Sequence, residues 1–323
     1  MRLQKYYVAM TLGFVLLILP VFLTDKHHLN IAVMTLMYAA LALFWNWVGG
    51  YTGQLSFAHI VFFGIGAYTS TLLFLHFNVS PWLGMLVGGI LSSVIAGFLS
   101  YWTVRLKGPF FALATLALSQ VSLIVAVFWK DLTGGSQGLS LPLAMSFQNM
   151  LFDSKAAYYF IICVLVLIGL SVSVRIENSR TGYLLKALKL SEAAAEAVGI
   201  NSLKLKVRIM CLSAFFTSLA GTFYAQYIMY IDPYSVFNLE LNILMILIVM
   251  IGGQAAYLGP MIGALLLVPV NEVLRSELAQ FGDGIHGMLY GAILMLIIIL
   301  APQGVIGMLR KWNTRRLSKY QSE

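Results

Sequence analysis

Charged side chains are scarce in this sequence. Only 10% of its 323 residues are charged and 60% are hydrophobic, whereas a soluble domain carries about 25% charged residues. The mean hydropathy is +0.88. This composition excludes an ordinary soluble domain and indicates a chain that crosses a lipid membrane several times.

Cysteine is nearly absent. The two cysteines, Cys163 and Cys211, lie within or at the edge of apolar runs and have no metal-ligand spacing. Small, weakly polar side chains in such runs are most simply packing residues. The sequence therefore predicts no metal site and no cofactor bound by this chain.

Catalytic and nucleotide-binding motifs are also missing. There is no Gly-x-x-x-x-Gly-Lys-Ser/Thr phosphate loop, no nucleophile beside a base and no His-x-x-x-His metal set. We expect a chain that is not an enzyme and has no catalytic residues, so that any ATP is bound by partner subunits. The net charge of +8 does not indicate nucleic-acid binding, because basic and aromatic residues are not interleaved.

Long apolar runs dominate what is present. A helix needs about 20 apolar residues to cross a bilayer core, and about ten segments approach that length. They are Tyr6–Leu23, Ile31–Val48, Leu55–Leu75, Trp82–Val104, Phe110–Phe128, Tyr158–Val174, Ile209–Ile228, Leu241–Ile251, Pro260–Leu274 and Met288–Ala301. We expect an all-α polytopic membrane protein. Because the last three segments are short, eight full spans with two partial ones is the alternative count.

Basic residues set the expected orientation. If the N-terminus is cytoplasmic and all ten segments cross, sixteen of the 20 Lys and Arg residues are cytoplasmic. Two precede the first span, two follow the fourth, seven lie in the basic loop 175–208 and five in the tail 303–323. Since Lys and Arg are retained on the cytoplasmic side, we expect both termini to be inside.

The basic loop contains its own helix signals. Ser191 can cap a helix whose first turn holds Glu192, which favours the helix dipole. Ala193 and Ala194 are strong helix formers, and Gly199 is a natural stop because it tolerates the left-handed conformation. We predict a short helix outside the membrane whose small side chains let another protein approach closely.

A few polar residues fall inside the apolar segments. His59 is the only histidine well inside a span, so it is a functional candidate, although a neutral histidine bonded to a backbone carbonyl explains it equally well. Thr115, Gln120 and Asn242 are the other candidates to line a path through the membrane. Unsatisfied polar groups are costly in hydrocarbon, so their segments should face protein or water rather than lipid all round. By contrast, the almost wholly aliphatic Tyr158–Val174 can sit against lipid.

Two further patterns concern the turns and the ninth segment. Glycine clusters at residues 49–53, 133–138 and 252–260 are expected to form turns, the first and third of them cytoplasmic. Glu272 and Arg275 stand three residues apart, a spacing that lets them pair on one helix face.

Ordered motifs recur along residues 31–305. They are Gly53-Gln54-Leu55-Ser56-Phe57-Ala58-His59, Lys107-Gly108-Pro109-Phe110-Phe111, Thr133-Gly134-Gly135-Ser136-Gln137-Gly138, Gly221-Thr222-Phe223-Tyr224-Ala225 and Leu258-Gly259-Pro260. Together with Glu192-Ala193-Ala194 and Gly199, they resemble the branched-chain amino acid permease family of ABC importers, in its LivM-type subunit.

This resemblance implies an ABC-importer permease fold, with residues 1–323 forming one transmembrane permease domain. It implies a second, homologous permease subunit, two cytosolic ATPase subunits that use ATP, and an extracytoplasmic substrate-binding protein. It also implies a place among the lipids of a bacterial or archaeal cytoplasmic membrane. Within the basic loop, Glu192, Ala193, Ala194 and Gly199 would couple the permease to its ATPase.

The substrate is left more open. The resemblance implies branched-chain or related small amino acids, but permeases of this type are also known for urea and short amides. An ion-coupled secondary transporter is the alternative from a different class. A secondary transporter typically has ionisable groups at mid-membrane, whereas the spans here hold almost no acidic residue away from their ends.

Overall fold

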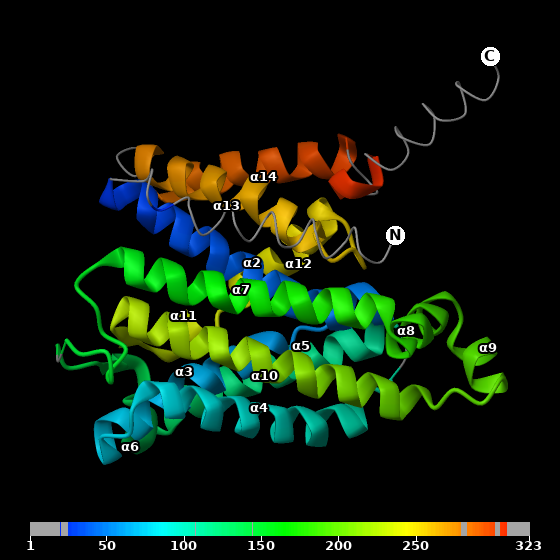
Figure 1. Ribbon diagram of the computed structural model, residues 1–323, viewed down its shortest axis with the longest axis horizontal. Coiled ribbons are helices and arrows are strands. Elements are labelled where there is room, and N and C mark those ends of the chain that lie inside the picture. Colours follow the sequence, from blue (N-terminus) through cyan, green and yellow to red (C-terminus); the bar gives the residue numbers. More distant parts are fainter. Residues whose placement is uncertain are drawn as a thin grey trace.

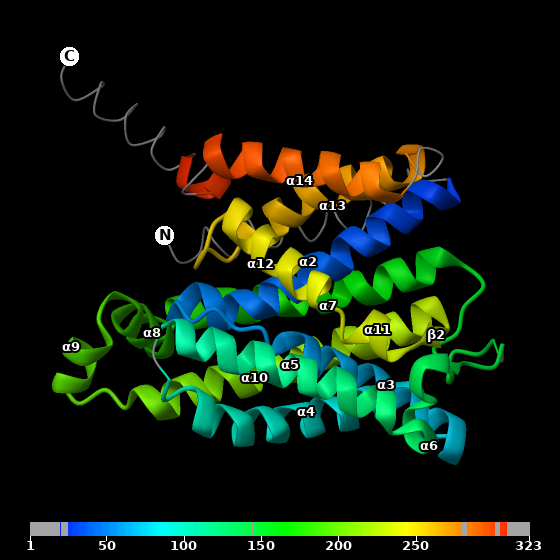
Figure 2. The ribbon, with the colours of Figure 1, turned by 180° about the vertical axis from the view of Figure 1, so that it is seen from behind.

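The computed structural model describes residue 20 and residues 25–106, 108–143, 145–278, 283–300 and 304–308. Long helices run side by side, with α13 and α14 along one edge of the bundle and α4 along the opposite edge (Figures 1 and 2). The helices are α2 (Lys26–Thr52), α3 (His59–Phe77), α4 (Pro81–Thr103), α5 (Pro109–Phe128), α6 (Lys130–Thr133), α7 (Lys155–Asn178), α8 (Arg180–Leu190), α9 (Glu192–Ala197), α10 (Ser202–Ile228), α11 (Pro233–Val236), α12 (Leu239–Gly252), α13 (Gly259–Leu278) and α14 (Asp283–Leu300).

The mostly helical, multi-pass architecture is confirmed. Within the described ranges, seven helical stretches are long and apolar enough to cross a membrane: α2, α3, α4, α5, α7, α10 and the stretch Pro233–Gly252 that joins α11 to α12. Each predicted segment from Ile31–Val48 onward coincides with a long helix. The predicted first span, Tyr6–Leu23, and tail residues 309–323 lie outside the described residues.

Helix α2 is the centre of the bundle. It packs against α7, α10, α12 and α13, and nearly all of its residues from Val33 to Thr52 are buried. A helix that is apolar on every side is expected in such a position, because it has no face suited to water. Its large aromatic side chains, among them Trp45 and Trp47, fill the space between the surrounding helices.

Helices α3, α4 and α10 approach one another through small residues. A Cβ built on Gly66 of α3 would lie 2.1 Å from the Ser218 carbonyl oxygen of α10, and one on Gly221 would lie 2.0 Å from the Phe63 carbonyl oxygen. Thr222 uses the same closeness and donates its hydroxyl hydrogen bond to the Gly66 carbonyl at 3.0 Å. Close backbone packing through small residues is typical of helices in membranes.

The first glycine cluster corrects one expectation. Residues 49–52 continue α2 as helix, and only Gly53, with φ 76°, begins the turn. The missing side chains are used for packing instead, because a Cβ on Gly49 would lie 2.1 Å from the Trp45 ring and one on Gly50 1.8 Å from the Asn46 amide oxygen. Glycine at these positions therefore makes room for side chains of the preceding helical turn.

The chain after Gly53 is not helical. The predicted segment Leu55–Leu75 becomes helical only at His59, where α3 begins. The Trp45 indole donates a hydrogen bond of 2.8 Å to the Ser56 carbonyl, which places the non-helical residues beside the interior of α2. Non-helical backbone inside a membrane bundle needs such partners, since lipid supplies none.

Lipid exposure in two helices follows the sequence-based expectation on one face of each. The aliphatic α7 buries Ile162 and Val166 in the core but exposes Phe160, Val164 and Ile168, so one face can sit against lipid. The more polar α5 exposes apolar residues such as Leu113 and buries Thr115 and Ser119. The hydroxyls of these two buried residues also bond to carbonyls of their own helix.

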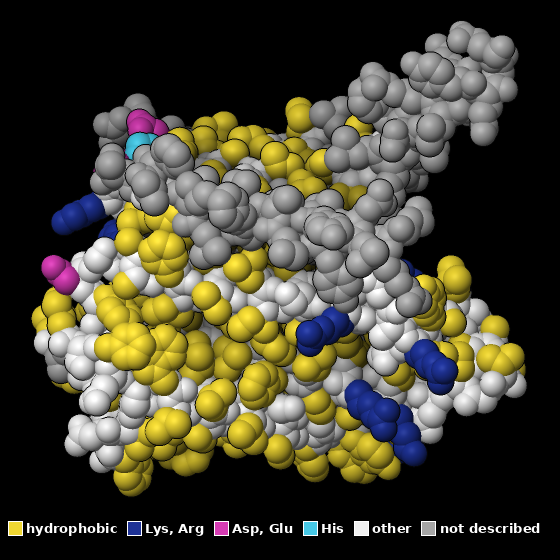
Figure 3. All heavy atoms as spheres, in the orientation of Figure 1, with side chains coloured by type: hydrophobic (Ala, Val, Ile, Leu, Met, Phe, Trp, Pro, Cys, Tyr) yellow, Lys and Arg dark blue, Asp and Glu magenta, His cyan; other side chains and the backbone are white. Residues whose placement is uncertain are grey.

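Two clusters of side chains mark the bundle surface. A broad hydrophobic face covers α7, α10 and α4, and Lys and Arg side chains gather toward the end that carries α8 and α9 (Figure 3). At the opposite end the strands β1 (Leu139–Ser140) and β2 (Tyr230–Ile231) pair antiparallel. Beside them, Gly134, Gly135 and Gly138 all have positive φ, so the turn expected at residues 133–138 is confirmed.

Candidate functional site

A short helix projects from one end of the bundle. Helix α9 (Glu192–Ala197) follows α8 after a single residue, and both lie at the same end in Figures 1 and 2. Ser191 is its N-cap, and the Ser191 hydroxyl accepts a hydrogen bond of 3.3 Å from the Ala194 amide. Gly199 lies just past the helix with φ 86°. The predicted short helix, its cap and its glycine stop are confirmed.

One side of α9 is small and open. Ala195 is buried against the bundle, whereas Ala193, Ala194 and Gly199 are exposed. Val198 beside them is 78% exposed. A Cβ built on Gly199 would have nothing within 4 Å. These four exposed residues, which we call the α9 face, present a surface that another backbone can approach closely.

Glu192, which was predicted to act with the α9 face, instead contacts α10. Its carboxylate lies 2.5 Å from the Lys206 ammonium of α10, and these two side chains are 28% and 4% exposed. In addition, the Ser202 hydroxyl of α10 donates a hydrogen bond to the Glu196 carboxylate. Both acidic side chains of α9 therefore fasten the helix to the start of α10. Glu192 holds the α9 face in place rather than forming part of it.

Lys189 is a residue whose contacts the sequence did not reveal. It lies in the last turn of α8, and its ammonium donates hydrogen bonds to the Gly50 carbonyl at 2.9 Å and to the Gln254 side-chain oxygen at 3.4 Å. Gly50 is among the last four residues of α2, whose carbonyls have no partner within their own helix. Partial burial lowers the pKa of Lys189 from its ordinary value. Lys189 thus caps α2 from another helix.

The loop between α12 and α13 joins the same contact. The Asn46 side chain of α2 accepts a hydrogen bond from the Ala255 amide at 3.1 Å and donates one to the Ala256 carbonyl at 3.2 Å. Lys189 and Asn46 together connect α8, the end of α2 and loop 253–258. Because α8 precedes α9 directly, few contacts separate the α9 face from α2 and this loop.

Two of the predicted path-lining residues hold the non-helical segment before α3. The Thr115 hydroxyl accepts a hydrogen bond of 3.1 Å from the Phe57 amide, and the Asn242 amide donates one of 2.5 Å to the Phe57 carbonyl. His59 follows two residues later, at the start of α3, and is fully buried. Gln120 is not brought to them, because it is exposed on α5. A path-lining role for the four stays a prediction.

The partner of His59 differs from the expected backbone carbonyl. The His59 Nε2 atom lies 2.8 Å from the Ser213 hydroxyl oxygen, and that hydroxyl donates a hydrogen bond of 2.6 Å to the Phe44 carbonyl. Because the hydroxyl donates to the carbonyl, it is available to accept from Nε2. A serine therefore stands between the ring and the backbone.

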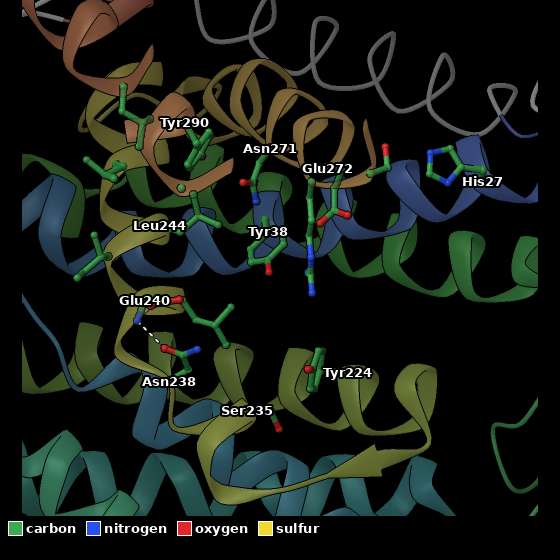
Figure 4. A pocket seen from close by; sticks show the side chains of 17 residues that line it. His27, Tyr38, Tyr224, Ser235, Asn238, Glu240, Leu244, Asn271, Glu272 and Tyr290 are labelled. Carbon is green, nitrogen blue, oxygen red and sulfur yellow. Dashed lines mark hydrogen bonds between the residues drawn. The ribbon is translucent and has the colours of Figure 1, made fainter. Parts of the chain in front are cut away.

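A large cavity lies among α2, α10, α11, α12, α13 and α14. Its volume is about 1150 Å³. Figure 4 shows Tyr38, Asn271 and Glu272 on one side and Asn238, Ser235 and Tyr224 on the other. None of the four predicted path-lining residues is among its described lining residues. The three-residue spacing of Glu272 and Arg275 predicts a pair on one helix face, but local spacing does not show that a cavity lies beside them.

These features define a class: a polytopic helical membrane protein with a short helix projecting at one end and a cavity of mixed polar and apolar lining among its helices. Residues 28–300 match the family described as the permease component of the branched-chain amino acid transport system. Because the match covers most of the chain, the chain belongs to this permease family.

Individual relatives agree with the family. The chain is 27% identical to the high-affinity branched-chain amino acid transport system permease protein LivM of Escherichia coli, over 95% of this chain and 76% of the relative. It is 24% identical to the LivH permease protein of the same system in Salmonella typhimurium, over 84% of this chain and 91% of that one. The ribose import permease protein RbsC of Haemophilus influenzae is also 24% identical, over 92% of each chain. No solved structure matches.

Proposed function

We propose that this chain is the permease subunit of an ATP-driven importer and forms the membrane path for branched-chain or related small amino acids. The family match over residues 28–300 carries this proposal. The names of the LivM and LivH relatives support the same substrate class. The chain supplies the path and no catalytic group of its own.

The energy for import comes from partner subunits in this proposal. Two cytosolic ATPase subunits bind and hydrolyse ATP, and the α9 face seats on one of them. Closure of the ATPase pair then moves α8, and Lys189 and Asn46 carry that motion to α2 and loop 253–258. Rigid helices joined by a few specific contacts are a common way to transmit such a movement.

The remaining partners follow from the family. A second, homologous permease subunit completes the path, and an extracytoplasmic binding protein delivers the substrate. Similarity to both a LivM and a LivH protein supports a pair of related permeases. Residues 1–323 act as one permease domain within this assembly.

The proposed topology has about ten spans, with both termini inside the cytoplasmic membrane of a bacterium or archaeon. Its support is the distribution of charge. The seven basic residues of loop 175–208 lie on the end of α7, on α8 and on the start of α10, at one end of the bundle. Lys26 and Lys155 lie at the starts of α2 and α7, at the other end. The α9 end is therefore cytoplasmic in this proposal.

The test is reconstitution of the chain in vesicles with its three kinds of partner protein. We expect leucine, isoleucine or valine to stimulate ATP hydrolysis and to accumulate inside only when ATP and the binding protein are present. Stimulation by urea, acetamide or ribose instead would reassign the substrate while keeping the ABC permease class. Accumulation driven by an ion gradient through the chain alone would overturn the proposal in favour of a secondary transporter.

A further inference from the structure

The cavity among α2, α12, α13 and α14 has a lining of two kinds. On α13, Glu272 and Arg275 stand one helical turn apart and both line the cavity. A negatively and a positively charged side chain with Cβ atoms about 5–6 Å apart therefore face the same space. On α12, Leu241, Leu244 and Leu247 follow one another at three-residue spacing and form an apolar wall. One part of the lining is therefore charged with both signs, and another part is aliphatic.

This lining is unsuited to lipid. Glu272 is partly exposed and Glu240, at the start of α12, is exposed, and both line the cavity. Carboxylates facing hydrocarbon are costly unless they meet water, protein or a charged ligand. The cavity volume of about 1150 Å³ slightly exceeds the range of about 300–1,000 Å³ that is common for small-molecule sites. The cavity thus has room for a small polar solute with its water.

We infer that this cavity is a transfer site for a zwitterionic amino acid. The Glu272 carboxylate accepts hydrogen bonds from the α-ammonium, the Arg275 guanidinium donates to the α-carboxylate, and the Leu241–Leu247 wall packs against an aliphatic side chain. The inference rests on the proposed function, because it assigns that function's substrate to named residues of this chain. An ammonium and a carboxylate on one carbon match an acid and a base placed one turn apart on one helix.

The arrangement also explains selection without tight binding. The two charges recognise the head group that all amino acids share, whereas the leucine wall favours aliphatic over polar side chains by burying apolar surface. A wide cavity holds its ligand loosely, as a transfer site must, since the solute has to leave again.

The first experiment measures occupancy by thiol labelling. Leu244→Cys is introduced into a chain whose native cysteines are replaced by serine, and the transporter is reconstituted in vesicles without ATP. Labelling by a small water-soluble maleimide is followed with increasing leucine, 4-methylpentanoate, which lacks the ammonium, and 3-methylbutylamine, which lacks the carboxylate. We expect leucine to slow labelling at lower concentration than either analogue. Equal protection by leucine and both analogues, or no protection by leucine, overturns the inference.

The second experiment assigns the ammonium contact. Glu272→Gln should raise the leucine concentration needed for half protection about tenfold or more, because a charge-assisted hydrogen bond is lost. Glu277→Gln is the matched control, since Glu277 lies on the same helix, is exposed and is not part of the described cavity lining. Glu272→Asp keeps the charge and should retain most of the protection. If leucine gives half protection at the same concentration in Glu272→Gln and Glu277→Gln, Glu272 is not the ammonium partner and the inference fails.

Failure of this site is distinguishable from failure of the proposed function. If vesicles with the unaltered chain import leucine with ATP, but leucine does not change the rate of labelling at Leu244→Cys, the proposed function holds and the cavity is not the transfer site. If the same vesicles import no branched-chain amino acid at all, the proposed function is wrong.

Discussion

The contact between Lys189 and the end of α2 makes the sharpest prediction about coupling. Lys189→Met keeps the length and apolar stem of the side chain but removes the ammonium. The Gly50 carbonyl then loses its 2.9 Å hydrogen bond, and Gln254 loses a weaker one at 3.4 Å. Gly50 is buried and has no partner within α2, so its carbonyl depends on this contact or on entering water.

The size of the effect follows from two opposing terms. Leaving a buried acceptor unpaired costs about 1–3 kcal/mol. Against this, the ammonium loses part of its hydration in the folded state, which is why its pKa is lowered although Lys189 is exposed, and methionine does not carry that penalty. We expect a net loss near the lower end, about 1 kcal/mol, which corresponds to a fall of a few degrees in Tm at most. The protein should therefore insert and fold normally.

Transport should suffer more than stability. Because Lys189 joins α8 to α2 and loop 253–258, its loss should lower leucine imported per ATP hydrolysed about tenfold, within the range of ordinary coupling energies. ATP hydrolysis itself should change by less than about twofold, since the α9 face is untouched. The assay is simultaneous measurement of uptake and phosphate release in vesicles. The matched control is Lys204→Met, which removes the same charge from an exposed position in the first turn of α10. Equal coupling ratios in the two variants would refute the reasoning.

Four other substitutions test three separate features. Gly199→Asp should cost about 1–2 kcal/mol of stability, because a side chain there meets open space but is strained by the φ of 86°. It should also prevent ATPase docking, measured as co-purification and as uptake. Gly221→Val should sharply lower the Tm and the yield. A Cβ at residue 221 would lie 2.0 Å from the Phe63 carbonyl oxygen, so α3 and α10 would have to separate. Tm and yield at the level of the unaltered protein would contradict this. Glu192→Gln and Lys206→Met should each lower the free energy of unfolding by about 2 kcal/mol, which is less than for a fully buried pair because Glu192 is partly exposed. In thermal unfolding, the double variant should be more stable than the sum of the two single losses predicts. Additive losses would argue against the pair.

Much of the local structure was predictable from the sequence. Apolar runs located the described long helices, because a membrane helix must satisfy its own backbone hydrogen bonds and therefore leaves a long hydrophobic signature. The Ser191 cap and the Gly199 stop predicted α9 because both act within one or two helical turns. The density of Lys and Arg marked the end that carries α8 and α9, but the predicted loop 175–208 was too long, because residues 175–178 continue α7 and residues 202–208 begin α10.

What the sequence could not provide were the contacts between distant residues. Thr115 was expected to face protein or water, but only the structure shows that its neighbour is Phe57, 58 residues earlier in the chain. Residues 49–52 were expected to turn, but they continue α2, where a Cβ on Gly50 would lie 2.9 Å from the Ala255 amide nitrogen of the loop after α12. Each outcome depends on which helix lies alongside, and helix neighbours are not encoded in local spacing.

By itself, the sequence determined a membrane-embedded helical chain with a short, capped helix between two spans, since hydropathy and capping act over a few residues. Only the tertiary structure decided that Lys189 reaches the end of α2, that Glu192 is held by Lys206, and that Glu272 and Arg275 face a cavity opposite leucines of another helix. Apolar helices pack against one another through their shapes, and shape complementarity between elements far apart in the chain exists only once the bundle is assembled.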